Sequence, residues 1–143
     1  MRISEVLGAK PSQDVITISP DATVRDLLGL LTEHNVGALI VSTDGTSVDG
    51  IVSERDVVRR LHEDDAILDG PVSGIMTTDV QTCDQDSVLD DLMKLMTEHR
   101  VRHVPVVTEG RLTGIISIGD VVKHRMAEVE FERDQLDSYV HQT

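Results

Sequence analysis

Aromatic residues are almost absent from this chain of 143 residues, which has one phenylalanine, one tyrosine and no tryptophan. The core must therefore be aliphatic, and an aromatic platform for stacking nucleic-acid bases is not expected. The single cysteine, Cys83, excludes an internal disulfide and a cysteine-based zinc site. No apolar run reaches the length of a signal sequence or a transmembrane helix, so we expect a cytoplasmic protein.

Positive charge is also scarce. The chain has 13 Lys and Arg against 26 Asp and Glu, which gives a formal net charge of −13. Nucleic acids and anionic membranes are bound through cationic surface, so we expect neither as a partner. A hydrophobic content of 39% with 27% charged residues is typical of a folded globular chain.

The main organising feature is an internal repeat. Residues 14–45 match residues 79–110, with Thr32-Glu33-His34 against Thr97-Glu98-His99 as the longest identical run in this part. One residue is then left out of the second copy, after which Gly50-Ile51-Val52-Ser53 matches Gly114-Ile115-Ile116-Ser117. The sequence therefore contains a duplicated unit of about 60 residues. We call residues at matching positions of the two copies twins.

Hydrophobic periodicity and turn signals predict the order β-α-β-β-α in each copy. The expected first-copy elements are strands at 15–18, 38–41 and 48–52 and helices at 24–34 and 53–63. Those of the second copy are strands at 80–83, 103–107 and 112–116 and helices at 89–99 and from 117 onward. Pro105 inside its strand indicates an edge or a bulge.

One such unit is too small to bury both faces of its sheet, so we expect the two to pack sheet against sheet around one shared core. The predicted fold is mixed α/β (α+β), a single pseudo-two-fold domain with a groove between the repeats. Its predicted parts are repeat 1 (1–63), a linker (64–74), repeat 2 (75–126) and a helical tail (127–143). The tail is a candidate for a dimer contact or a frayed end.

Both copies pass from a buried strand into a helix through Ser-x-x-Asp, as Ser53 with Asp56 and Ser117 with Asp120. The structural interpretation is a capping box, which alone would explain a single such motif. The functional interpretation uses the same geometry, because a helix N-terminus suits phosphate and a carboxylate can accept hydrogen bonds from two sugar hydroxyls.

Two β-α-β-β-α copies, each with a terminal Gly-h-h-Ser-x-x-Asp and a preceding His-x-Val-x-x-h-Pro/Ile-Val, resemble the tandem CBS domain (Bateman module) family. The resemblance covers about residues 3–126 and is to stand-alone CBS-pair proteins. It implies a regulatory module, commonly a homodimer, that needs no cofactor. The ligand would be an adenosine derivative: AMP, ADP, ATP or sometimes S-adenosylmethionine.

The family's site, carried over residue by residue, implies one cleft in which Asp56 holds ribose hydroxyls and Ser53 and Arg55 meet phosphate. Its other residues would be Thr77, Val80 and Gln81 around adenine, Val101 and Pro105 as apolar walls, and Arg102 and His103 as positive charge. A second cleft would use Ser117 and Asp120, with Ala9, Val15 and Ile16 on one side and Val36, Gly37 and Ala38 on the other.

The two implied clefts differ in charge. Arg55, Arg102 and His103 of the first cleft have Gly119, Gly37 and Ala38 as twins, and Arg contributes strong charge-assisted bonds to phosphate. We therefore expect phosphate groups at the Asp56 cleft, while the Asp120 cleft would be empty, weaker or filled by a less anionic adenosyl ligand. Surface pairing with carboxylates is an equal alternative for Arg102 and His103.

These residues distinguish among three classes of function. The leading hypothesis is a regulatory module that binds adenine nucleotides and signals occupancy through a conformational or dimer change. The alternative is a structural or interaction module with degenerate clefts that assembles with an unidentified partner enzyme or transporter. An enzyme is not expected, because no acid/base pair, activated nucleophile or Walker-type loop is present. No metal site is expected, and Cys83 is interpreted as a small buried hydrophobe.

Overall fold

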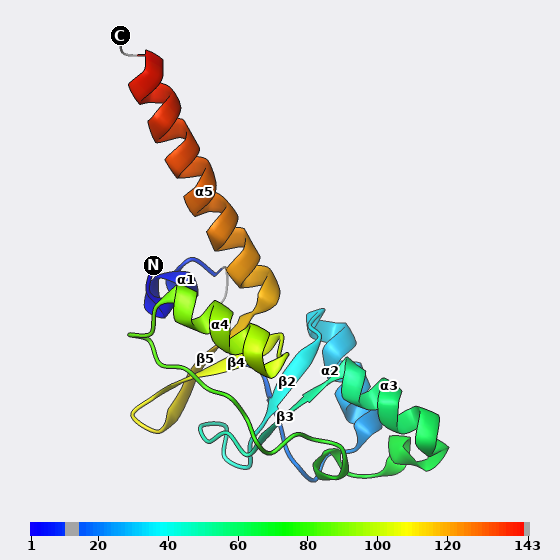
Figure 1. The fold of residues 1–143 in the computed structure, drawn as a ribbon. Coiled ribbons are helices and arrows are strands. Elements are labelled where there is room, and N and C mark those ends of the chain that lie inside the picture. The colour runs from blue at the N-terminus through cyan, green and yellow to red at the C-terminus, as the bar shows by residue number, and fades with distance from the viewer. Residues whose placement is uncertain (11–14, 142–143) are drawn as a thin grey trace.

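The structure is a computed structural model, which describes residues 1–10 and 15–141 (Figure 1). Asp14, where the predicted repeat begins, lies outside the described residues, as do the last two residues of the predicted tail. The elements are α1 (Ile3–Gly8), β1 (Thr17–Ile18), α2 (Val24–His34), β2 (Ala38–Val41), β3 (Gly50–Ser53), α3 (Glu54–Glu63), η1 (Asp65–Asp69), η2 (Val72–Gly74), α4 (Leu89–His99), β4 (His103–Thr108), β5 (Arg111–Ser117) and α5 (Ile118–His141).

The first half is a three-stranded sheet in the order β1-β2-β3, with β1 parallel and β3 antiparallel to β2. All four residues of β2 are buried, as expected for a central strand. The bounds of α2 and β2 agree with the sequence prediction, whereas β1 is two residues shorter than predicted and β3 begins at Gly50. Hydrophobic periodicity therefore locates these elements well and their ends less well.

The second half contains the antiparallel pair β4-β5, with a shift in register between Val106 and Val107. The bulge follows directly after Pro105, which confirms the prediction made from that proline. The predicted strand at 80–83 is wrong, because in this segment only Cys83 forms a bridge to β4. A few residues earlier, Thr77 pairs with Ile51 of β3 in the first sheet. The segment thus crosses from one sheet to the other and cannot run along either.

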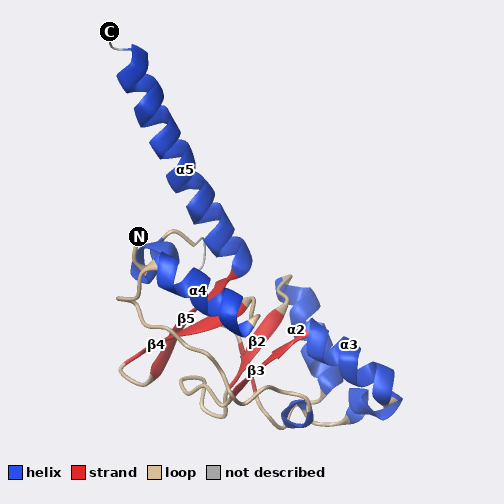
Figure 2. Cartoon of the chain, in the orientation of Figure 1, coloured by secondary structure: helices blue, strands red, loops and turns tan. Residues whose placement is uncertain are grey.

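All buried apolar residues except Ala38 and Ile40 of β2 fall into two clusters, which corrects the expectation of one shared core. Each cluster fills the space between one sheet and its helices, and Figure 2 shows the strands gathered in the middle of the body. Each half is completed by a segment that precedes it or follows it in the chain. Ile3 and Val6 of α1 are fully buried in the second cluster. Val72 from the predicted linker and Ile75 from the start of predicted repeat 2 are buried in the first.

The last helix, α5, begins at the second half and extends away from the body (Figure 1). Val121 near its start is buried in the second core, but most of its apolar residues are exposed. Within the described residues, no helix combines the length and the apolar character needed to cross a bilayer.

Candidate functional site

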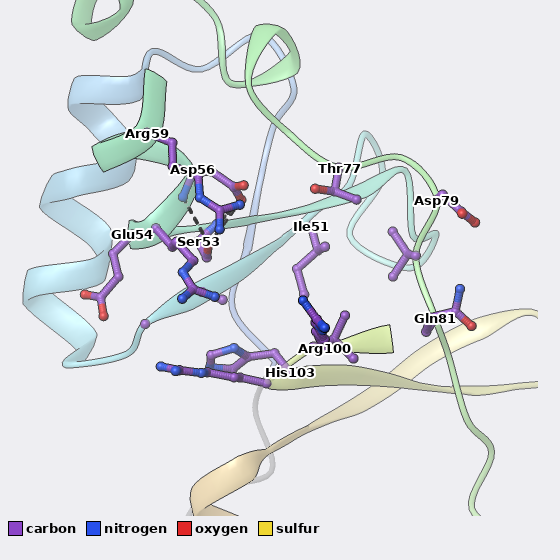
Figure 3. Close-up of a pocket in the computed structure, with 16 residues that line it drawn as sticks. Ile51, Ser53, Glu54, Asp56, Arg59, Thr77, Asp79, Gln81, Arg100 and His103 are labelled. Atoms are coloured by element: carbon purple, nitrogen blue, oxygen red, sulfur yellow. Dashed lines mark hydrogen bonds between the residues drawn. The ribbon is translucent and has the colours of Figure 1, made fainter. Parts of the chain in front are cut away.

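Helix α3 begins at Ser53 with a complete capping box. The Asp56 amide donates to Oγ of Ser53 at 3.3 Å, and Oδ2 of Asp56 accepts from the Ser53 amide at 2.9 Å and from its Oγ at 3.1 Å (Figure 3). The structural interpretation of this motif is therefore correct for Oδ2. No described residue donates to Oδ1 of the same carboxylate, which stays available to a ligand.

A cavity of about 260 Å³ lies beside this helix start and takes its walls from both halves of the molecule. In Figure 3, Ser53, Asp56 and Arg59 lie on one side and Thr77 and Gln81 on the other. We call this cavity the Asp56 cleft. It brings together nine of the ten residues predicted for the first cleft: Ser53, Arg55, Asp56, Thr77, Val80, Gln81, Val101, Arg102 and His103.

Three predicted residues lie elsewhere than expected. Pro105 does not line the cavity, because it sits within β4 as a buried residue paired with Ile115. Gly37 and Ala38, which were assigned to the second cleft, line the Asp56 cleft. The reason is that the starts of β2 and β4 lie side by side: a Cβ atom on Gly37 would be 3.7 Å from the imidazole Cε1 of His103.

Two arginines of the cleft were missed by the sequence analysis. Arg59 follows Arg55 by one helical turn, and this i,i+4 spacing was a usable signal. Arg100 ends α4 in the left-handed conformation with φ 54°, as its twin Asn35 ends α2 with φ 51°. The replacement of Asn by Arg at this cap brings a further guanidinium to the cleft. The other lining residues that were not predicted are Ile51, Glu54 and Asp79.

Four arginines therefore line one cavity in a chain with twice as many acidic as basic residues: Arg55, Arg59, Arg100 and Arg102. Among the described residues, no ion pair or side-chain hydrogen bond engages any of the four. The surface pairing considered for Arg102 is thus not observed. The carboxylates of the lining are fewer, namely Glu54, Asp56 and Asp79. The arrangement suits an anionic ligand that also has neutral hydrogen-bonding groups.

His103 lies at the boundary between the two halves. Burial lowers the pKa of its imidazole below the ordinary 6.5, although the charges of Asp120 and Glu54 act in the opposite direction. The nearby cations Lys10 and Arg102 add to the lowering. The side chain is therefore neutral at pH 7 and can be protonated when an anion is bound beside it.

The Asp120 carboxylate in the second half has the same backbone setting as Asp56 but a different partner. Oδ2 of Asp120 accepts from the Ser117 amide at 2.9 Å and from Nζ of Lys10 at 3.0 Å. Burial acts to raise the pKa of Asp120, but the bonds from Ser117 and Lys10 outweigh it and the pKa lies below the ordinary value. Lys10 was not among the predicted residues.

The structure describes the remaining residues predicted for the second cleft, namely Ala9, Val15, Ile16 and Val36. Ala9 and Val36 are exposed, while Val15 and Ile16 are half-buried. Ile16 packs against the first core. Across the described residues, no group of three or more His, Cys, Asp or Glu side chains gathers in a way that could hold a metal ion.

Comparisons with known proteins identify the family of this chain. The sequence profile of the CBS domain matches residues 3–63 and 72–127. A crystal structure of a CBS-domain-containing protein from Agrobacterium tumefaciens is 43% identical, with a TM-score of 0.83, and the match covers 87% of this chain and 99% of that one. A CBS domain-containing protein from Bacillus subtilis is 32% identical over 113 residues, which are 79% of this chain and 80% of that protein.

A CBS domain protein from Pyrobaculum aerophilum, whose structure is complexed with AMP, is also similar. It is 29% identical with a TM-score of 0.73, and the match covers 84% of this chain and 89% of that one. The chain belongs to the CBS domain family and carries the domain twice. It is a CBS pair, a regulatory ligand-binding module.

Proposed function

We propose that this CBS pair binds an adenine nucleotide, AMP, ADP or ATP, in the Asp56 cleft and signals its occupancy. The observation that carries the proposal is the set of four arginines around one cavity, which no described residue engages in an ion pair, next to a carboxylate whose Oδ1 receives no bond from a described residue. The P. aerophilum relative complexed with AMP supports the choice of an adenine nucleotide. The net positive lining favours these anions over S-adenosylmethionine at this cleft.

Each part of the cleft has a role suited to one part of a nucleotide. Oδ1 of Asp56 accepts from the ribose hydroxyls, while Oδ2 stays in the capping box. The apolar side chains of Val80 and Val101 pack on the adenine ring. The arginines and the α3 N-terminus bind phosphate. The cavity is slightly smaller than the roughly 300–1,000 Å³ usual for small-molecule sites, so the phosphates extend toward its exposed arginines.

The cleft can signal ligand occupancy because its walls come from both halves of the molecule. Ser53 and Asp56 belong to the first half, whereas Val101 and His103 belong to the second. A ligand that contacts both favours the arrangement of the halves in which both contacts are made. Residues 77–83, which pair with one sheet at Thr77 and the other at Cys83, transmit that preference between the sheets.

The test of nucleotide binding is calorimetric titration of AMP, ADP and ATP into the wild type and Asp56→Asn. The variant keeps the side-chain volume and weakens the charged hydrogen bonds, each worth about 1.5–3 kcal/mol, so affinity should fall by roughly tenfold or more. Asp26→Asn is the matched control, because Asp26 forms the same capping box with Thr23 on α2 away from the cleft. Equal losses in both variants, or no binding to the wild type, would overturn the proposal.

A homodimer formed through α5 is the second part of the proposal. Five exposed apolar residues lie along one side of this helix, with exposures from 42% at Ile118 to 65% at Leu136. We call them the α5 stripe: Ile118, Val122, Met126, Val129 and Leu136. At the N-terminal end of α5, Ile118, Val122 and Met126 border an apolar groove of about 210 Å³ between α4 and α5. A stripe of this kind is the expected contact surface for another helix.

Charge favours a second copy in antiparallel orientation. A parallel pair would place Glu128, Glu130 and Asp134 beside the same acids of the other copy. An antiparallel pair centred on Val129 still sets Glu128 opposite Glu130. It separates the two Asp134 residues, however, and brings Lys123 near Asp134 and Asp137 of the other helix. Sedimentation velocity should show a dimer for the wild type and a monomer for Val129→Glu. Ala127→Glu, on the opposite side of α5, is the control and should remain dimeric; dissociation of both variants, or of neither, would contradict this interface.

A further inference from the structure

The twin carboxylates Asp56 and Asp120 have the same local geometry and different partners. Both accept from the amide of their capping serine at 2.9 Å, and the serine hydroxyls lie at 3.1 Å and 3.0 Å. Nothing in the two capping boxes therefore distinguishes them. Within the described residues, no cation lies within ion-pairing distance of Asp56, whereas Lys10 contacts Asp120 at 3.0 Å.

Lys10 is held in this position by two contacts and by its place in the chain. Its ammonium also donates to the Ile115 carbonyl at 2.8 Å, and its side chain is only 25% exposed. It follows α1 directly, whose Ile3 and Val6 are fixed in the second core. The twin of Ile115 is Ile51, which lines the Asp56 cleft. Lys10 therefore contacts the counterparts of two lining residues of that cleft.

A lysine at this point changes what the second half can bind. Oδ1 of Asp120 receives no hydrogen bond from a described residue, but a ribose there would have to fit beside the ammonium on Oδ2. It would also share a carboxylate whose charge Lys10 already neutralises. The ion pair is about three-quarters shielded from water. In such a shielded place the separation of opposite charges costs more than it does at the surface.

We propose that Lys10 acts as a tethered cation that occupies the Asp120 carboxylate and restricts nucleotide binding to one molecule per chain. This inference rests on the proposed function and deepens it, since it names the residue that makes the two halves unequal. Lys10 is thereby a specificity-determining residue of the second half. Its replacement by a neutral side chain of similar length should free Asp120 for a second ligand.

The experiment is calorimetric titration of AMP into four full-length proteins: wild type, Lys10→Met, Lys10→Gln and the double variant Lys10→Met/Asp120→Asn. The expected stoichiometry is one AMP for the wild type, two for both single variants, and one again for the double variant. Thermal unfolding of each protein without AMP checks that it is folded, and the two single variants guard against a fold defect particular to one of them.

The outcomes separate this inference from the proposed function. Two AMP molecules on the wild type, or one on both single variants, would overturn the role of Lys10 while leaving nucleotide binding intact. Binding to the single variants but not to the wild type, abolished in the double variant, would support Lys10 and reject the Asp56 cleft. Absence of AMP binding from all four proteins would overturn both.

Discussion

Gly50 and Thr77 approach each other so closely that a Cβ atom on Gly50 would lie 2.8 Å from the Thr77 carbonyl oxygen. That oxygen accepts from the Ile51 amide at 2.9 Å and so joins the first sheet to the segment that crosses to the second. The twin glycine, Gly114, is also crowded, but there a Cβ atom would meet only the side chain of Leu7, at 2.6 Å from Cδ2. A side-chain end can rotate away, whereas a hydrogen-bonded carbonyl cannot retreat without loss of its bond.

The first prediction follows from this difference between the twin glycines. Gly50→Ala should lower the free energy of unfolding by about 1–3 kcal/mol, the usual cost of overpacking a closely packed site. Gly114→Ala should cost less, because Leu7 can adjust. Urea denaturation of both variants measures the effect, and equal losses, or a larger loss for Gly114→Ala, would contradict the explanation.

The second prediction concerns the phosphate-binding role of the arginines. Arg59→Gln should weaken ATP binding by roughly 1 kcal/mol, or about fivefold, since one partly screened charge contact is lost. Adenosine, which has no phosphate, should bind both proteins alike. Arg60→Gln is the matched control, because Arg60 lies next in α3, contacts Glu63 at 4.0 Å and does not line the cleft. Calorimetry that finds the two variants equally impaired, or adenosine binding impaired by Arg59→Gln, would count against the role.

The repeat made most of the fold predictable, because each helix of a copy is marked by its own apolar spacing. The bounds of α2 and α4 agree with the predicted helices, and the helix start at Ser53 follows from its capping pattern. The strand at 80–83 was not predictable in the same way. Its pattern resembles that of 15–18, but tertiary contacts draw Thr77 and Cys83 to different sheets and override the local preference.

The candidate site was predictable where the twin positions keep the same residues and less so where they differ. Ser53 and Asp56 were found by their motif, and the structure places both at the cleft. Lys10 could not be found, because its contact with Asp120 spans 110 positions of the chain. It also precedes residue 14, where the matching of the two copies begins, so the repeat itself carries no sign of a cation there.

The third prediction is a dependence of stability on pH that originates at His103. Burial lowers its folded-state pKa below the ordinary 6.5, so between these two values the unfolded chain binds more protons. The free energy of unfolding should therefore begin to decrease as the pH falls through about 6.5 and continue to decrease down to the folded-state pKa. Asp120 and Glu54 face the imidazole and reduce the effect, while Lys10 and Arg102 increase it.

Urea denaturation between about pH 7.5 and pH 5.5 measures this dependence in the wild type and in His103→Asn. The variant has no imidazole at this position and should lose less stability over the same interval. An identical slope in the two proteins would show that another group causes the dependence. A slope of opposite sign in the wild type, with stability rising on acidification, would mean that folding raises the pKa of His103.

The fourth prediction concerns Cys83, which the sequence analysis interpreted as a small buried hydrophobe. The residue is half-buried and packs against the second core, and burial, with a smaller contribution from Asp84, raises the pKa of its thiol to about 11. Only the thiolate reacts with disulfide reagents, and at pH 8 roughly one thiol in a thousand would be ionised. Ellman's reagent should therefore label the native protein slowly and the urea-unfolded protein fast. Since one cysteine is present, the two rates report on the same atom, and a native rate close to the unfolded rate would show that Cys83 is an accessible, ordinary thiol.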